Sequence, residues 1–359
     1  MKAALLCEAR SPLSVEDVEL DGPREGEVRI RVAASGLCHS DYHLMTGDLP
    51  IPVPAVLGHE VAGYVEAVGD HVPGLKVGDM VVTCFSSYCG HCGECQTGHN
   101  SRCTDKPKGP PREMGSRISW RGKPVYQLAG IGGFAEEVVA HHSSVVKISD
   151  RVPPAAAALL GCGVLTGAGA ALNGARVRPG SSVVVVGCGG VGLNVIQGAR
   201  IAGASQIIAV DLHPAKLQTA RTFGATDGVL AGPTAVAEVK ELTRGGVDYA
   251  FEVIGVPAAM RDAFLMLRMH GTLTIVGMAP TGSEFSVPAL DILYKDARII
   301  ASGMGDAPFQ LAIPQLARFY LDGQLKLDEL VSRRIALNQI NEGYDAMASG
   351  EVARNVVVF

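Results

Sequence analysis

The sequence has few aromatic residues, no run of like charges and no long apolar segment. Only 5% of its 359 residues are Phe, Trp or Tyr, and a single Trp is present. The 31 basic and 36 acidic side chains give a formal net charge of −5. Partners such as nucleic acid or an anionic membrane surface usually require a basic face, so this balance argues against both. No apolar stretch is long enough to span a bilayer once its glycines and charges are counted.

A targeting signal is also lacking at the N-terminus. The opening MKAALLCEARSPLSVEDVEL has no sustained apolar core, and its Ala-Leu-Leu-Cys run predicts a first strand. We therefore expect a cytoplasmic protein. With 47% apolar and 19% charged residues, the chain has the composition of a globular enzyme, and its length allows two domains.

The pattern of apolar residues changes near the middle of the chain. The first 150 or so residues predict many short strands, among them 27–33, 60–68 and 79–83. From Ser182 onward, predicted strands alternate with predicted helices, which is typical of a doubly wound parallel sheet. The predicted strands are 183–187, 206–211, 247–253 and 272–277, and the helices are 191–204, 214–223 and 258–269. Helices at 309–321 and 340–347 and a strand at 355–359 follow, which suggests that the chain returns to its first domain.

A glycine-rich turn links the first strand of the second half to its helix. The turn reads Gly187-Cys188-Gly189-Gly190-Val191-Gly192, and Asp211 ends the next strand 19 positions later. A lone G-x-G-x-x-G is weak evidence and also occurs in other α/β folds, but strand, helix and acidic residue together are typical of a dinucleotide site. The glycines permit a tight turn and close approach of pyrophosphate to the helix N-terminus.

Asp211 indicates which dinucleotide is bound. A carboxylate at this position accepts hydrogen bonds from the ribose hydroxyls and repels a 2′-phosphate. Leu212 follows, and no nearby Arg is present to neutralise a phosphate. The sequence therefore predicts NAD rather than NADP.

Nine cysteines are present, and four of them, Cys89, Cys92, Cys95 and Cys103, fall within fifteen residues. In a chain without a secretion signal such clustering favours a metal over disulfides. Four thiolates on one loop suit a tetrahedral structural zinc. An iron–sulfur cluster is the alternative, but a ferredoxin-type run normally has Pro after its fourth Cys, whereas Thr104 follows Cys103. A cluster of free buried thiols is a further alternative, disfavoured by this density.

Three further residues with metal-ligand chemistry, Cys38, His59 and Cys162, are dispersed along the chain. Taken singly, a Cys is usually a small core residue and a His a hydrogen-bonded structural group. Taken together, two Cys and one His form the ligand set of an open catalytic zinc, with the fourth position available to water or substrate.

With these motifs in this order, the sequence resembles the zinc-dependent alcohol dehydrogenases of the medium-chain dehydrogenase/reductase family. The segments 38–41, 58–60 and 161–163, the four-Cys loop and the glycine turn carry the resemblance, which covers essentially the whole chain. It implies an α/β protein with a GroES-like, β-rich catalytic domain (1–162 and 304–359) and a Rossmann NAD-binding domain (163–303), with the active site in the cleft between them. Family members form homodimers or homotetramers.

The resemblance also implies roles for individual residues. Cys38, His59 and Cys162 resemble the catalytic zinc ligands, and the four-Cys loop resembles the structural zinc site. Asp41 resembles the carboxylate that holds the His59 ring, and Glu60 an acid near the catalytic zinc. Ser40 and His43 resemble the proton relay linked through the nicotinamide ribose, although His43 alone could be a surface loop residue. The predicted cofactor contacts are Gly187, Gly189, Gly190, Val191, Gly192, Asp211, Lys216, Thr166 and Arg354; for Lys216 and Arg354 a solvated charge is the alternative. The predicted substrate pocket comprises Leu49, Phe85, Leu128, Ala129 and Met278.

The expected reaction is reversible hydride transfer between a primary, hydrophobic or aromatic alcohol and NAD, by way of a zinc-bound alkoxide. The alternative within the family is an S-(hydroxymethyl)glutathione dehydrogenase, with which the chain shares the stretch 115–124. However, Pro107 stands where that class carries an Arg, and His43 replaces its Tyr.

Two hypotheses of other classes are a non-catalytic protein that binds NAD and zinc, and a zinc-ribbon protein that binds nucleic acid. The relay residues Ser40 and His43 argue against the first. The acidic balance and the single four-Cys loop argue against the second.

Overall fold

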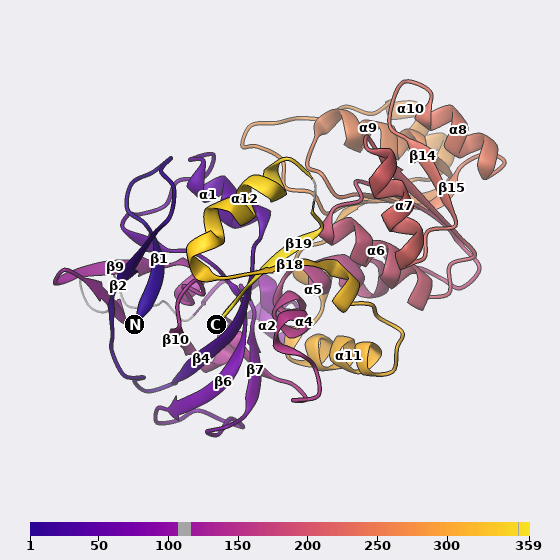
Figure 1. The fold of residues 1–359 in the computed structure, drawn as a ribbon. Coiled ribbons are helices and arrows are strands. Elements are labelled where there is room, and N and C mark those ends of the chain that lie inside the picture. Colours follow the sequence, from indigo (N-terminus) through magenta and orange to yellow (C-terminus); the bar gives the residue numbers. More distant parts are fainter. Residues whose placement is uncertain (107–115, 351) are drawn as a thin grey trace. The chain divides into compact units, whose positions relative to one another are not determined.

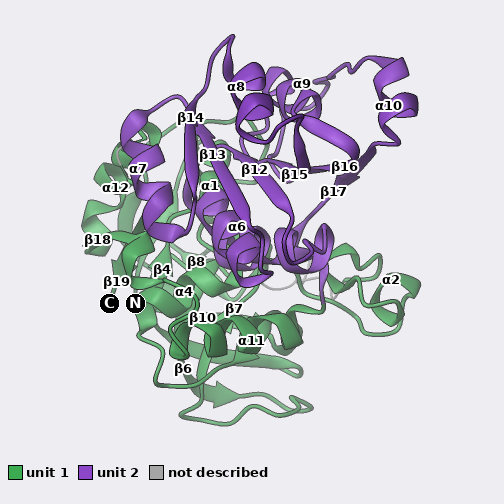
Figure 2. Ribbon diagram, turned by 90° about the vertical axis from the view of Figure 1, so that its right-hand side faces the viewer, with its two compact units in different colours: residues 1–162, 308–359 green, residues 163–307 purple. Residues whose placement is uncertain are grey.

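The computed structural model describes residues 1–106, 116–350 and 352–359 (Figure 1). Pro107 and Gly115 lie outside these residues. Both belong to the segments that distinguish or link the chain and the glutathione-dependent class in sequence. The chain divides into two compact units (Figure 2). Unit 1 contains residues 1–162 and 308–359, and unit 2 contains residues 163–307.

Strands dominate unit 1. They are β1 (Lys2–Leu6), β2 (Ser14–Asp17), β3 (Glu19–Leu20), β4 (Glu27–Gly36), β5 (Ala55–Val56), β6 (Glu60–Val68), β7 (Met80–Thr83), β8 (Ile118–Trp120), β9 (Lys123–Gln127), β10 (Glu137–His141), β11 (Val145–Lys147), β18 (Val331–Ile335) and β19 (Arg354–Val358). One sheet has the order β2-β1-β5-β9-β8-β3, and the other has the order β11-β7-β6-β4-β19-β18. The long strand β4 also pairs with β10 through its first half, and β19 pairs with its last residues. The C-terminal strand therefore joins the N-terminal sheet, as its sequence suggested.

Short helices connect the strands of unit 1. They are α1 (His39–Met45), α2 (Gly93–Gln96), α4 (Pro154–Ala158), α11 (Phe309–Leu321) and α12 (Ile340–Ala348), with 3-10 turns η1 (Asn100–Arg102), η2 (Leu128–Gly130), η3 (His142–Ser144), η4 (Leu159–Gly161), η7 (Asp328–Leu330) and η8 (Leu337–Gln339). One apolar cluster joins Leu5, Leu57, Phe134 and Tyr344, and a second contains Ile30, Val61 and Val81. Burial of these side chains is the main stabilisation of the scaffold that carries the site.

Unit 2 is a parallel sheet with the strand order β14-β13-β12-β15-β16-β17. The strands are β12 (Ser182–Val186), β13 (Gln206–Asp211), β14 (Asp227–Leu230), β15 (Val247–Glu252), β16 (Leu267–Ile275) and β17 (Arg298–Ala301). The helical segments are α5 (Gly163–Gly169), η5 (Ala170–Gly174), α6 (Gly190–Ile201), α7 (Pro214–Phe223), α8 (Ala235–Leu242), α9 (Pro257–Leu265), α10 (Ala289–Lys295) and η6 (Met304–Asp306). Because the strand order reverses at β12, the carboxyl end of this strand is the expected ligand-binding point. The predicted doubly wound sheet is confirmed.

Two predicted boundaries next to each other are wrong. The sequence predicted a helix over 258–269 and a strand over 272–277, but α9 ends at Leu265 and β16 already begins at Leu267. Leu267 pairs with Val247 of β15, so its side chain is buried as part of a strand and not of a helix. A short apolar run fits either periodicity, and here the strand pairing decides.

Among the described residues, no single helix is both long and apolar enough to cross a membrane. Only the bent pair formed by Pro154–Gly161 and Gly163–Gly174 meets the length and composition test, and only when its two parts are taken together.

Candidate active site and metal centres

The first site begins where β4 ends and α1 starts. Cys38 is the extended residue at the N-terminus of α1, and Ser40 donates a hydrogen bond from Oγ to Cys38 Sγ over 3.2 Å. Asp41 lies in the first turn of the helix and is completely buried. A buried carboxylate is costly unless it accepts hydrogen bonds, so the orientation of Asp41 is tied to the groups that donate to it.

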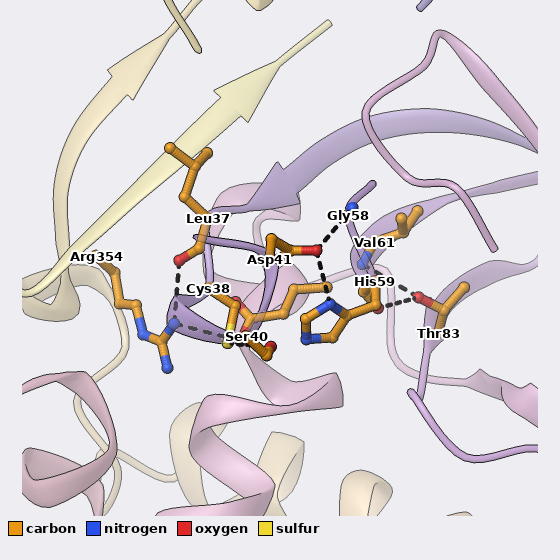
Figure 3. A network of polar contacts seen from close by, with 10 residues as sticks. Leu37, Cys38, Ser40, Asp41, Gly58, His59, Val61, Thr83 and Arg354 are labelled. Carbon is orange, nitrogen blue, oxygen red and sulfur yellow. Dashed lines mark hydrogen bonds and ion pairs between the residues drawn. The ribbon is translucent and has the colours of Figure 1, made fainter. Parts of the chain in front are cut away.

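His59 is one of these groups. Asp41 Oδ1 accepts from the backbone N–H of Gly58 over 2.9 Å and lies 3.3 Å from His59 Nδ1 (Figure 3). Because a carboxylate only accepts, Nδ1 carries a proton, and in the neutral ring it is Nε2 that presents the lone pair. His59 Nε2 is buried and has no hydrogen-bond partner among the described residues. A buried imidazole nitrogen of this kind fits a metal ligand, for which it is the atom left available.

Cys162 reaches the same place from a distant segment. The chain passes very close to β7 just before it: a Cβ on Gly161 would lie 1.8 Å from the carbonyl oxygen of Thr83. Glycine at 161 is therefore required for this approach. Thr83 also steadies His59, because its Oγ1 donates to the His59 carbonyl over 2.8 Å and accepts from Val61 N–H over 3.1 Å (Figure 3).

Four side chains converge as a result. One ligand atom from each of Cys38, His59, Glu60 and Cys162 lies within 4.8 Å of the others. Sulfur and imidazole ligands of this number and spacing suit zinc. The structure thus brings together all three residues predicted to bind the catalytic zinc, and it adds Glu60 to the same group.

The electrostatics of this cluster are strongly coupled. A hydrogen bond with Cys162, together with His59 and Arg354, holds the pKa of Cys38 well below its ordinary value, whereas the same hydrogen bond and burial raise the pKa of Cys162. Burial is the largest single influence on His59 and lowers its pKa, but the charge and hydrogen bond of Asp41 together with Cys38 outweigh it, so the net pKa shift is upward. Burial raises the pKa of Glu60 to about 7, against the opposing charge of Arg354. The cluster concentrates acidic groups that a cation would neutralise.

Arg354 lies beside this cluster. Its Nη1 donates to the carbonyl of Leu37 over 3.0 Å and lies 3.5 Å from Glu60 Oε1, and its side chain is only 5% exposed. Arg354 is therefore buried and paired, so the alternative of a solvated surface charge is wrong for this residue. Its predicted contact with the cofactor pyrophosphate stays a prediction.

The four-Cys loop forms a second thiol cluster. One sulfur from each of Cys89, Cys92, Cys95 and Cys103 lies within 4.8 Å of the others. The Sγ–Sγ distances are 4.0 Å for Cys89–Cys95 and 3.8 Å for Cys92–Cys103. Tetrahedral Zn–S bonds of about 2.3 Å place the sulfurs about 3.8 Å apart, so the spacing fits zinc. Backbone N–H groups, foremost that of Cys95, lower the pKa of Cys92 to about 5, which favours the thiolate that a metal requires.

In unit 2, the glycine turn follows β12 at the point where the strand order reverses. A Cβ on Gly192 would lie 1.8 Å from the carbonyl oxygen of Gly187, so only glycine lets α6 approach the turn this closely. A Cβ on Gly189 would meet nothing within 4 Å, which leaves the helix N-terminus accessible to a phosphate. The Asp211 carboxylate links the turn to the end of β13. Its Oδ2 accepts a hydrogen bond from Cys188 N–H over 2.8 Å, and its Oδ1 accepts one from His213 N–H over 3.0 Å.

The other predicted site residues are placed as follows. The Phe85 ring packs edge-on against His59, with centroids 4.9 Å apart. Leu49 lines an apolar depression of about 460 Å³ in unit 1. Leu128 is buried, and Ala129 adopts a left-handed conformation beside it. In unit 2, Met278 is 55% exposed, Lys216 is half-buried, and Thr166 Oγ1 lies 3.8 Å from Met304 Sδ.

Two residues that shape the first site were not predicted from the sequence. Thr83 was expected only as part of a strand, and its contact with the His59 backbone depends on the pairing of β6 with β7. Asp48 was not considered, yet its carboxylate contacts the ring of His43. Neither residue belongs to a recognisable local pattern.

The known proteins that this chain resembles include zinc-binding dehydrogenases, in agreement with the two candidate metal-binding clusters described above. Residues 24–150 match the alcohol dehydrogenase GroES-like domain, and residues 190–320 match the zinc-binding dehydrogenase domain. A solved alcohol dehydrogenase zinc-binding domain protein from Burkholderia ambifaria is 36% identical, with a TM-score of 0.96 over 100% of this chain and 98% of that one. Benzyl alcohol dehydrogenase from Acinetobacter calcoaceticus is 32% identical, with a TM-score of 0.94 over 100% and 99% of the two chains.

A zinc-binding dehydrogenase from Sinorhizobium meliloti, solved with NADP bound, is 27% identical, with a TM-score of 0.82 over 100% and 99% of the chains. The relatives thus include a protein that binds the phosphorylated cofactor. From the two domain matches and the full-length similarity, the chain belongs to the zinc-dependent alcohol dehydrogenases of the medium-chain dehydrogenase/reductase family.

Proposed function

We propose that the protein is an NAD-linked alcohol dehydrogenase that interconverts primary, hydrophobic or aromatic alcohols and their aldehydes. The observation that carries this proposal is the convergence of Cys38, His59 and Cys162, with the buried Nε2 of His59 left without a hydrogen-bond partner among the described residues. These three residues would hold a catalytic zinc. The thiols of Cys89, Cys92, Cys95 and Cys103 would hold a structural zinc.

A bound zinc supplies a Lewis acid that favours loss of the alcohol proton, and NAD supplies the hydride acceptor. The remaining chemistry belongs to the chain. Asp41 fixes the tautomer of His59, and Thr83 holds its backbone. Ser40, two residues after Cys38, would accept the substrate proton. His43, whose side chain is 38% exposed, would release the proton to solvent.

Replacing Ser40 with alanine tests this assignment. We expect the turnover number to fall about 100-fold, because a positioned acid–base group contributes two or more orders of magnitude. Ser40→Thr is the matched control: it keeps a hydroxyl and should retain most of the activity. Steady-state kinetics with the zinc content of each variant is the measurement. Equal turnover in Ser40→Ala and the wild type would rule out the relay.

Apolar side chains around the site favour hydrophobic alcohols. The ring of Phe85 lies beside His59. Leu128 belongs to the apolar cluster of unit 1 that contains Leu5, and Leu49 packs against this cluster. Such walls bind the apolar part of a substrate, with few polar groups to recognise a peptide such as glutathione. In the stretch shared with the glutathione-dependent class, Arg117 is buried and paired with Glu27 at 2.7 Å, so its immediate role is structural.

NAD is the proposed cofactor, although a relative binds NADP. The Asp211 carboxylate already ties the glycine turn to β13 and is only 9% exposed. The Asp211 oxygens accept hydrogen bonds from the backbone N–H groups of Cys188 and His213. Their remaining lone pairs are available to accept hydrogen bonds from the ribose hydroxyls. A 2′-phosphate at this point would meet a like charge, which typically costs several kcal/mol in a specific site.

A screen of alcohols tests the whole proposal. Ethanol, hexanol, benzyl alcohol and formaldehyde with glutathione would each be offered with NAD⁺ and with NADP⁺. We expect benzyl alcohol with NAD⁺ to give the highest kcat/KM. With NADP⁺ the kcat/KM should be about 100-fold lower, because the like charge at Asp211 costs about 3 kcal/mol and each tenfold step corresponds to about 1.4 kcal/mol. Higher activity on formaldehyde with glutathione would support the alternative enzyme class, and comparable rates with NADP⁺ would refute the cofactor assignment.

We also propose that the chain self-associates, as the resemblance to the family implies. Leu290, Leu293 and Tyr294 on α10 are each more than 60% exposed, and Ile299 on the edge strand β17 is 39% exposed. Apolar residues gathered on neighbouring elements, together with an open sheet edge, are typical of a surface covered in an oligomer.

A further inference from the structure

Asp48 pairs with the ring of His43 at the end of α1. Thr46 is the C-terminal cap of the helix, Gly47 turns the chain, and Asp48 follows. Asp48 Oδ2 lies 3.0 Å from His43 Nδ1 and accepts a hydrogen bond from Thr46 Oγ1 over 2.8 Å. The carboxylate is therefore held from two sides by residues of the helix end that carries His43.

We propose that Asp48 is a positioning residue for proton release, holding the His43 ring so that Nε2 is the atom that accepts the proton. This inference rests on the relay role proposed above for His43. It adds to that role a residue which neither the sequence motifs nor the relatives assign.

The chemistry follows from the donors and acceptors. A carboxylate only accepts hydrogen bonds, so Nδ1 must carry the ring proton that points at Asp48. In the neutral ring Nε2 then has the lone pair. When Nε2 takes up a proton, the ring becomes positive and Asp48 balances the new charge. The same proton is afterwards released from Nε2 to water, so no other co-reactant is needed.

The charged surroundings are consistent with this role. The hydrogen bonds from His43 and from Thr46, together with the nearby charge of Arg10, lower the pKa of Asp48, so the carboxylate is ionised at neutral pH. Arg10 stays close because its side chain packs against Gly47. The Asp48 side chain is 61% exposed, and exposed ion pairs contribute little to stability. Loss of the pair should therefore alter the orientation of the ring more than the stability of the fold.

A double-mutant cycle with His43→Gln and Asp48→Asn tests the proposal. The holoenzyme would be mixed with benzyl alcohol and NAD⁺, and the first-order rate of NADH formation in a single turnover would be followed against pH. We expect Asp48→Asn to slow this step about tenfold near neutral pH, with unchanged zinc content and KM. In the His43→Gln background the same substitution should change the rate less than about twofold, because its effect acts through the ring. Asp17→Asn, which breaks an exposed pair with Lys2 elsewhere in unit 1, is the control and should leave the rate unchanged.

The possible outcomes separate the two proposals. Equal effects of Asp48→Asn in both backgrounds, or no effect in the wild type, would overturn the role of Asp48 while leaving His43 in place. An unchanged rate in His43→Gln itself would overturn the relay, and with it the present inference. Only a strong effect that disappears without His43 supports the pairing as functional.

Discussion

Replacing His59 with alanine is expected to remove one of two bound zinc ions and to lower kcat/KM at least about 1000-fold. His59 Nε2 is a buried nitrogen without a hydrogen-bond partner in the part of the chain that the structure describes, and its ring is held by Asp41 through Nδ1. Without this ligand, two thiols and the carboxylate of Glu60 remain, and the metal loses its imidazole nitrogen. A Lewis acid contributes several kcal/mol to alcohol activation, and about 4 kcal/mol corresponds to about a thousandfold in rate.

Metal analysis and steady-state kinetics on the same sample provide the measurement. His71→Ala is the matched control, because His71 is 80% exposed and pairs with the surface residue Glu25. We expect this control to keep two zinc ions and full activity. NAD binding, measured by fluorescence quenching, should persist in His59→Ala, since the glycine turn and Asp211 belong to unit 2. Retention of both ions together with activity would show that the converging residues are not a metal site.

Replacing Cys92 with serine should release the second zinc and unfold the loop around it. The segment 89–103 has almost no apolar core of its own: α2 contains no buried residue, and Asn100 and Cys103 are its buried members. Its order therefore depends on the four sulfurs and on the N–H groups that donate to them. Structural zinc can contribute about 10 kcal/mol or more in small domains, so loss of one ligand should melt the loop.

Three readouts check this prediction: zinc content, the number of thiols that react with a disulfide reagent, and cleavage by a protease within the loop. We expect one zinc to be lost, the remaining loop cysteines to become reactive and the loop to be cleaved faster by the protease. Cys7→Ser is the control, since Cys7 lies outside the loop and contacts Ser14. A Cys92→Ser protein with two zinc ions and an intact loop would contradict the structural role.

The sequence predicted most of unit 2 because the information there is local. Strands β13 and β15 and helix α7 begin and end within a residue of the predicted ranges, since their apolar periodicity and flanking turns lie within each segment. The end of α9 was misplaced because Met266 and Leu267 can be buried equally well in a helix or a strand. Helices α8 and α10 were not predicted, and α10 contains no buried residue.

By itself, the sequence determined the fold class, the glycine turn with Asp211 and the four-thiol loop, because each depends on residues close together in the chain. Only the tertiary structure decided that Cys38, His59 and Cys162 meet, that Thr83 steadies His59 and that Arg354 lies against Glu60. These contacts depend on the pairing of β4 with β6 and β19, and on the close passage at Gly161. Pairing of this kind joins segments that are distant in sequence, so no local pattern records it.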